Sequence, residues 1–172
     1  MSFFIWKAAR GKILTRDYLR RGFPIVDWCC FCQRSGENVD HLLLHCEEVS
    51  QLWSFALRSF GVARVLPKQV IDLLAGWKNW LGKYSLNIWN LVPHYVMWVI
   101  RRERNSRILK DMELTGDQIL ALFVGTMFDW SHYWGFTSRE SIPHFLMDYF
   151  FHNIYFLSVK KNCVLIIFVI LL

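Results

Sequence analysis

The sequence predicts a mainly α-helical protein, in which a small cysteine-rich module is flanked by helices and followed by a helical extension and an irregular apolar tail. Apolar residues recur at helical spacing in several segments, whereas the alternation typical of β-strands is hardly visible. Hydrophobic residues make up 54% of the chain and charged residues 20%, a composition that excludes general disorder. Four of the five cysteines fall within residues 27–48.

The residues before the cysteines predict two short helices. Apolar residues lead the first helix, and Gly11 interrupts it. Thr15 is a candidate N-cap for the second helix, which ends at Gly22 ahead of Pro24. The chain begins with apolar residues and places its positive charges after them, which is the reverse of a secretory signal. We therefore expect an intracellular protein, in the nucleus or cytoplasm, whose thiols are free or bind metal.

Helical patterns continue after the cysteines. Apolar residues at helical spacing predict a helix from Glu47 that has Gly61 as its C-cap. Another helix is expected to start at Pro67, because proline suits the first turn. A long helix then has Pro93 near its start or at a kink.

A capping-box pattern begins the last predicted helix, with Thr115 as N-cap and Gln118 three residues later. These patterns divide the chain into a cysteine-containing domain (1–61), a helical extension (62–134) and an apolar C-terminal tail (135–172). The tail is either a buried element or a stretch translated beyond the real domain. It ends in ten apolar residues, and a helix that spans a bilayer needs roughly 20, which disfavours a membrane anchor without excluding it.

The cysteines and histidines of residues 27–48 have the spacing of metal ligands. Cys29 and Cys32 form C-x2-C, eight residues follow, and His41 and Cys46 form H-x4-C. A tight turn at C-x2-C aims two thiolates at one point, and the serine, glycine and asparagine that follow favour a chain reversal. Three thiolates and one imidazole predict a closed Cys3His zinc site in a zinc-knuckle-like module, with no open position for a substrate.

Cys30 and His45 are two spare candidates that complicate this choice. Only one residue separates Cys30 from Cys32, which strains a tetrahedral centre, and the neighbouring side chains of His45 and Cys46 diverge. We therefore expect both spare residues to face away from the other four. Two alternatives stay open, namely buried cysteines without metal and a thiol enzyme that uses Cys46 and His45. No orienting carboxylate or oxyanion-hole motif supports the second alternative, and we predict that the chain is not an enzyme.

The net charge of +6 is concentrated in residues 1–28 and 101–110, which carry +4 each. Such clusters favour an anionic partner such as RNA or DNA, and the alternative is two solvated helix faces. Trp28 and Phe31 could stack on bases but are expected to pack beneath the zinc loop instead. The candidate phosphate-contacting residues are Arg16, Arg20, Arg21, Arg101, Arg102, Arg104 and Arg107.

Residues 3 to about 60 resemble the reverse-transcriptase zinc-binding domain found at the C-terminal end of plant non-LTR (LINE-type) retrotransposon polyproteins and in genes derived from them. The features that carry the resemblance follow in order: “ILTRDYLRRG”, the C-x2-C pair, “DHLLLHC” and Leu52-Trp53. A looser similarity continues in “WVIRRERNSRIL”. The sequence departs from the family at Cys30, where the family usually has proline or another non-ligand.

The resemblance implies that Cys29, Cys32, His41 and Cys46 are the zinc ligands, in agreement with their spacing. It further implies a non-catalytic zinc module that assists nucleic-acid binding. The alternative is a zinc-stabilised helical interaction module that docks on the polymerase part of a retroelement polyprotein. The chain lacks the adjacent Asp-Asp pair of a reverse-transcriptase active site.

Overall fold

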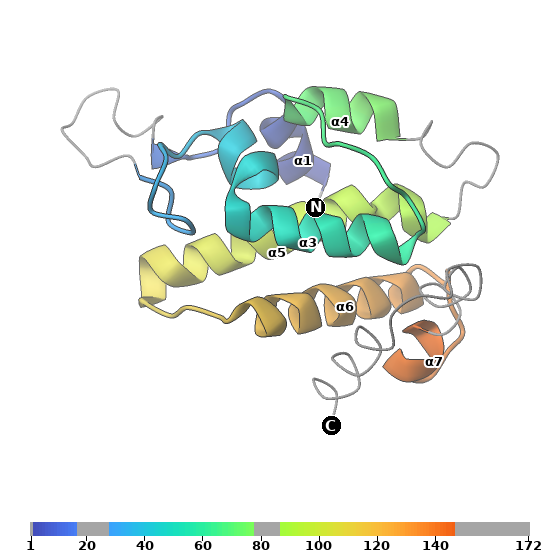
Figure 1. Cartoon of the computed structure of the whole chain (residues 1–172). Coiled ribbons are helices and arrows are strands. Elements are labelled where there is room, and N and C mark those ends of the chain that lie inside the picture. The colour runs from blue at the N-terminus through green and yellow to red at the C-terminus, as the bar shows by residue number, and fades with distance from the viewer. Residues whose placement is uncertain (1, 17–27, 78–86, 147–172) are drawn as a thin grey trace.

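The computed structural model describes residues 2–16, 28–77 and 87–146 (Figure 1). Beyond residue 16, the helix predicted after Thr15 lies outside these ranges. The part of the predicted apolar tail that begins at residue 147 also lies outside them. Within the described residues, the regular elements are helices, and the β pairing consists of one isolated antiparallel bridge between Trp28 and Gly36. The predicted mainly α-helical fold is therefore confirmed.

Helices of very different lengths build the fold. They are α1 (Ser2–Ala9), the π-helical turn η1 (His41–His45), α3 (Glu47–Ser59), α4 (Val70–Gly76), α5 (Asn87–Lys110), α6 (Gly116–Tyr133) and α7 (Ile142–Leu146). Figure 1 shows α5 and α6 side by side in opposite directions, with α3 along α5, while α1 and α4 lie together on the other side of α5. The long helix α5 thus contacts α1, η1, α3 and α6.

The predicted helix ends are confirmed where they depend on local backbone chemistry. Thr115 and Gln118 form the capping box of α6. Gly61 has a φ of +67°, and the N–H groups of Gly61 and Val62 donate to the carbonyls of Arg58 and Leu57. This is the Schellman arrangement, which a glycine in the left-handed region allows.

The helix α4 begins at Val70, and the predicted start at Pro67 is wrong by three residues. A side chain from far along the chain decides this start, because the Val70 N–H donates to Asp40 Oδ1 at 2.8 Å. The carboxylate satisfies a donor that the first helical turn cannot satisfy itself. His45 contacts the same segment through the Lys68 carbonyl, at 3.0 Å from Nε2. The cysteine-rich module therefore positions α4.

Pro93 lies inside α5, six residues after its first residue. Proline has no N–H for the carbonyl four residues earlier, which belongs to Trp89. The indole N–H of Trp77 donates to that carbonyl at 2.8 Å, and the two indoles stack with centroids 4.3 Å apart. A tertiary contact thus satisfies the acceptor that proline leaves free, and the helix continues through Pro93.

We expect Trp77→Phe to lower the free energy of unfolding by about 1–3 kcal/mol, because the aromatic packing is largely retained while the buried Trp89 carbonyl loses its donor. Urea denaturation followed by circular dichroism measures this loss. Trp134→Phe is the matched control, since Trp134 is 56% exposed, and it should change the value by less than about 0.5 kcal/mol. Equal losses in the two variants would contradict the role assigned to Trp77.

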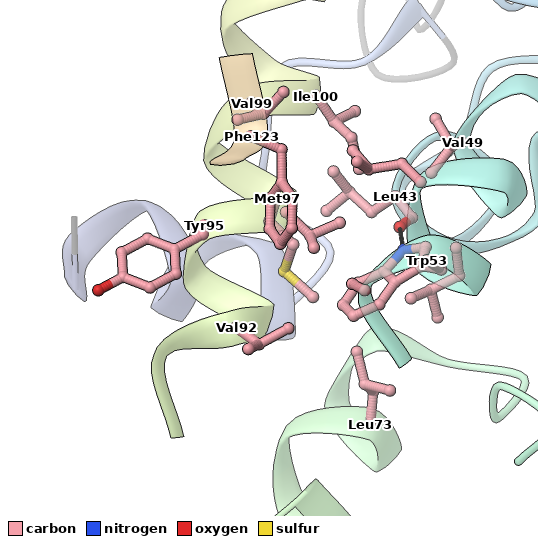
Figure 2. Close-up of a cluster of buried hydrophobic side chains, with 14 of the residues drawn as sticks. Leu43, Val49, Trp53, Leu73, Val92, Tyr95, Met97, Val99, Ile100 and Phe123 are labelled. Carbon is pink, nitrogen blue, oxygen red and sulfur yellow. Dashed lines mark hydrogen bonds between the residues drawn. The ribbon is translucent and has the colours of Figure 1, made fainter. Parts of the chain in front are cut away.

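One buried apolar cluster extends from Phe4 in α1 to Leu146 in α7. Figure 2 shows Trp53 of α3 facing Met97 and Val92 of α5 across this cluster. The cluster includes residues on both sides of the predicted boundary after residue 61, so the cysteine-rich module shares its core with the helical extension. None of the helices in the described ranges has the length and apolar character needed to cross a bilayer.

Candidate metal centre

The C-x2-C pair lies in a tight turn at the start of the cysteine-rich module. The Cys29 N–H donates to the Ser35 carbonyl at 2.7 Å, and the Gln33 N–H donates to the Cys29 carbonyl at 3.0 Å. Gln33 takes up the left-handed conformation that closes the turn, with a φ of +53°. The predicted chain reversal is present. Its left-handed residue is Gln33, whereas glycine and asparagine are the residues that usually adopt this conformation.

The other two candidate ligands lie at the two ends of η1. The Cys46 N–H donates to the His41 carbonyl at 2.7 Å, which closes a five-residue turn. In an α-helix, residues five apart point about 140° away from each other, because each residue turns the chain by about 100°. The wider turn brings His41 and Cys46 to the same side. Asn38 starts this turn by accepting the His41 N–H on Oδ1 at 2.8 Å.

Trp53 holds η1 in place from the neighbouring helix α3. Its indole N–H donates to the Leu43 carbonyl at 2.7 Å, the bond drawn dashed in Figure 2. Leu42, Leu43 and Leu44 are all buried, so the turn is anchored by apolar packing as well as by this bond. Packing on α3 and α5 therefore fixes the backbone that carries His41 and Cys46.

The structure brings together the four residues selected by spacing. One ligand atom from each of Cys29, Cys32, His41 and Cys46 lies within 4.8 Å of the other three. The two cysteine sulfurs of Cys29 and Cys46 are 3.8 Å apart, and Cys32 Sγ is 3.4 Å from His41 Nε2. Ligand atoms around a tetrahedral zinc ion are about 3.5–3.8 Å apart for Zn–S near 2.3 Å and Zn–N near 2.0 Å. The donor set and its spacing thus fit zinc.

The two spare residues behave differently from each other. His45 is exposed and bonds to the Lys68 carbonyl, so it faces away from the cluster as expected. The thiol of Cys30 contacts the Cys29 sulfur, which differs from the expectation that it would face away. Cys30 still does not belong to the group of four mutually close ligand atoms.

The sulfur contacts shift the pKa values of the neighbouring cysteines in opposite directions. Hydrogen bonds with Cys30 and Cys46 hold the pKa of the Cys29 thiol well below its usual value. The same bonds, together with burial, raise the pKa values of the Cys30 and Cys46 thiols.

Two buried carboxylates pair with arginines of α5, and sequence reasoning missed both. Glu37 is fully buried, and its Oε1 accepts from the Arg16 N–H at 2.9 Å and from Arg104 Nη2 at 2.6 Å. Glu103 accepts from Arg107 Nε at 2.8 Å and from the Leu114 N–H at 2.9 Å. A glutamate looks the same in the sequence whether it is solvated or buried, so only the fold reveals these partners.

The candidate phosphate-contacting arginines occupy different environments. Arg104 pairs with Glu37, while Arg107 pairs with Glu103 and Glu113, donates to the Cys30 carbonyl and covers the Phe31 ring. Arg16 is half-buried beside Glu37 through its backbone. Arg101 and Arg102 are exposed on α5, and Arg20 and Arg21 lie outside the described residues.

The two candidate stacking residues, Trp28 and Phe31, differ in their exposure. Phe31 is buried under Arg107, as expected for packing beneath the turn. Trp28 is 58% exposed, so the expectation that it packs there was wrong. Its backbone bridge to Gly36 fixes the chain at this point while leaving the indole at the surface.

Residues 1–53 match a family described as zinc-binding in reverse transcriptase. The match includes all four clustered residues and ends at Trp53, whose indole holds η1. It supports the predicted reverse-transcriptase zinc-binding domain and zinc as its metal. No curated protein and no solved structure gives a significant match to the chain.

Proposed function

We propose that the chain carries a structural, non-catalytic zinc module, derived from a plant LINE-type retroelement, that assists nucleic-acid binding. The observation that carries this proposal is the convergence of Cys29, Cys32, His41 and Cys46 within 4.8 Å of one another. Four protein ligands complete a tetrahedral zinc shell and leave no position for an activated water or a substrate. The module therefore organises a surface.

The charge distribution supports nucleic acid as the partner. The chain has a net charge of +6, and Arg101 and Arg102 are exposed on α5 next to the zinc-binding domain. Zinc would fix η1, which contacts α5. It would thereby hold the zinc-binding domain against the helix that carries Arg101 and Arg102. Basic groups that neutralise phosphates release counterions and give salt-dependent affinity.

Two measurements on the purified full chain test this function. Native mass spectrometry should find one zinc ion per chain. Fluorescence anisotropy with a labelled single-stranded RNA should show affinity that falls about 20-fold between 50 and 200 mM salt, as expected for about three phosphate contacts. A chain without zinc would contradict the metal assignment, and absent or salt-independent RNA binding would contradict the nucleic-acid role.

A docking function is the second candidate, because apolar side chains gather at the surface beside the metal centre. Trp28, Ile108 and Met112 line one hollow there, and the nearby Leu109 is 77% exposed. Such a surface suits contact with the polymerase part of a retroelement polyprotein. Capture of a reverse-transcriptase segment by the chain after nuclease treatment supports docking, and loss of capture in Trp28→Ser with zinc retained would locate it. Failure of capture by the unchanged chain counts against docking.

A further inference from the structure

A cavity of about 540 Å³ opens between α1, η1 and α5. Phe4, Leu42 and Leu43 contribute apolar surface to it, and Lys7, Lys12 and Arg101 contribute positive charge. Two of these residues, Leu42 and Leu43, belong to the turn that carries His41. Zinc binding at His41 would therefore fix the position of the cavity wall that Leu42 and Leu43 form.

The end of α1 brings the two lysines together. Gly11 has a φ of +63°, and the Lys12 N–H folds back to donate to the Lys7 carbonyl at 2.8 Å. This Schellman turn places Lys12 beside the last turn of α1 although four residues separate it from Lys7. Both lysines consequently line the same cavity.

The positive charges at this cavity are available to an anion. Among the described residues, Lys7, Lys12 and Arg101 form no ion pair with a carboxylate. Arg101 lies over the rings of Phe4 and Trp98, at 4.7 and 5.4 Å from their centroids. Arg104 also lines the cavity, but its charge is balanced by Glu37.

An aromatic surface adjoins the cavity on α1. Phe3 and Trp6 are 66% and 49% exposed, and their rings stack with centroids 6.2 Å apart and planes 13° from parallel. Lys7 lies over Phe3 and Arg10 lies over Trp6, at 4.7 and 4.5 Å. Lys7 thus belongs both to the cavity and to this aromatic surface.

We propose that this cavity binds a phosphate of single-stranded nucleic acid and that Phe3 and Trp6 stack against an adjacent base. Positive charge beside exposed aromatic rings is the combination that binds single strands, because every unpaired base presents a flat face. In a duplex, stacked and paired bases cannot reach these rings. The proposal rests on the nucleic-acid role proposed above and assigns its location to α1 and α5.

Matched charge variants of the full-length zinc-loaded chain test the cavity. Lys7→Gln/Lys12→Gln removes two positive charges at the cavity, and Arg58→Gln/Lys68→Gln removes two exposed charges in the last turn of α3 and just before α4, outside both basic segments. With a labelled 15-nucleotide single-stranded RNA, the cavity variant should reduce the slope of log affinity against log salt by about 0.7, since the cavity holds one phosphate and each single-strand phosphate contact contributes about 0.7. The control variant should leave the slope unchanged.

Aromatic variants test the stacking surface. Trp6→Ala should weaken binding to the single strand about tenfold, within the range known for base stacking, and Trp134→Ala should not. Equal slopes in the two charge variants, or tighter binding of duplex RNA by the unchanged chain, would overturn the cavity proposal while leaving the nucleic-acid role in place. If the unchanged chain binds no RNA, both proposals fail. Zinc content and circular dichroism confirm that each variant is folded.

Discussion

We expect His41→Ala to abolish stoichiometric zinc binding and to release the turn of residues 28–36 from η1. Cys29 and Cys46 are buried, and their sulfurs lie 3.8 Å apart, an arrangement that the ion would stabilise by joining the two ligand pairs. Structural zinc contributes on the order of 10 kcal/mol in small zinc modules, so this is the largest effect that we predict. Native mass spectrometry measures the zinc, and amide hydrogen exchange measures the loss of local order.

His45→Ala is the matched control for this experiment, because His45 is exposed and directs its ring to the Lys68 carbonyl. It should retain one zinc ion per chain. Cys32→Ser should behave like His41→Ala, since it removes the partner that lies 3.4 Å from the histidine. Zinc loss in His45→Ala together with zinc retention in His41→Ala would show that the ligand set is wrong. Helices α5 and α6 should stay protected from exchange in each variant, because their packing does not pass through the metal.

We expect Glu37→Gln to lower the free energy of unfolding by about 3–5 kcal/mol. Glu37 is fully buried, and Arg104, whose side chain is 12% exposed, pairs with it at 2.6 Å. The substitution conserves shape but leaves the arginine charge without compensation in a poorly solvated site. Urea denaturation of the zinc-loaded chain measures the change.

Glu47→Gln provides the comparison, because Glu47 pairs with Arg34 at the surface, where both side chains are more than half exposed. It should cost less than about 1 kcal/mol. The double variant Glu37→Met/Arg104→Met should recover most of the stability lost in Glu37→Gln, because it removes both charges together. If Glu37→Gln cost no more than Glu47→Gln, the buried pair would not be what fastens the cysteine-rich module to α5.

Local chemistry made part of this protein predictable. The capping box of α6 and the left-handed glycine after α3 depend on residues close in the chain, and both were found where expected. The same applies to the two ligand pairs, since spacing restricts which thiols and imidazoles can face one point. The start of α4 was misplaced because Asp40, thirty residues away, caps Val70.

The sequence does not show which arginines of the basic run pair with a buried carboxylate. Arg101 and Arg104 belong to the same basic run, yet Arg101 faces a cavity while Arg104 is neutralised by Glu37. Nothing local distinguishes them, because the carboxylate comes from a segment 67 residues away. The cavity itself has the same origin, since α1, η1 and α5 form it only after they pack.

The sequence by itself determined the helical class, the ends of its most regular helices and the four candidate ligands, because each depends on residue periodicity or short spacing. Only the tertiary structure decided that η1 forms a wider, π-helical turn and that the Trp77 indole donates to the carbonyl left free by Pro93. It also decided which positive charges are paired with a carboxylate, as Arg104 is with Glu37. These features depend on partners distant in the chain. Burial makes such pairings favourable, because an unsatisfied carbonyl or charge away from water costs free energy wherever its partner comes from.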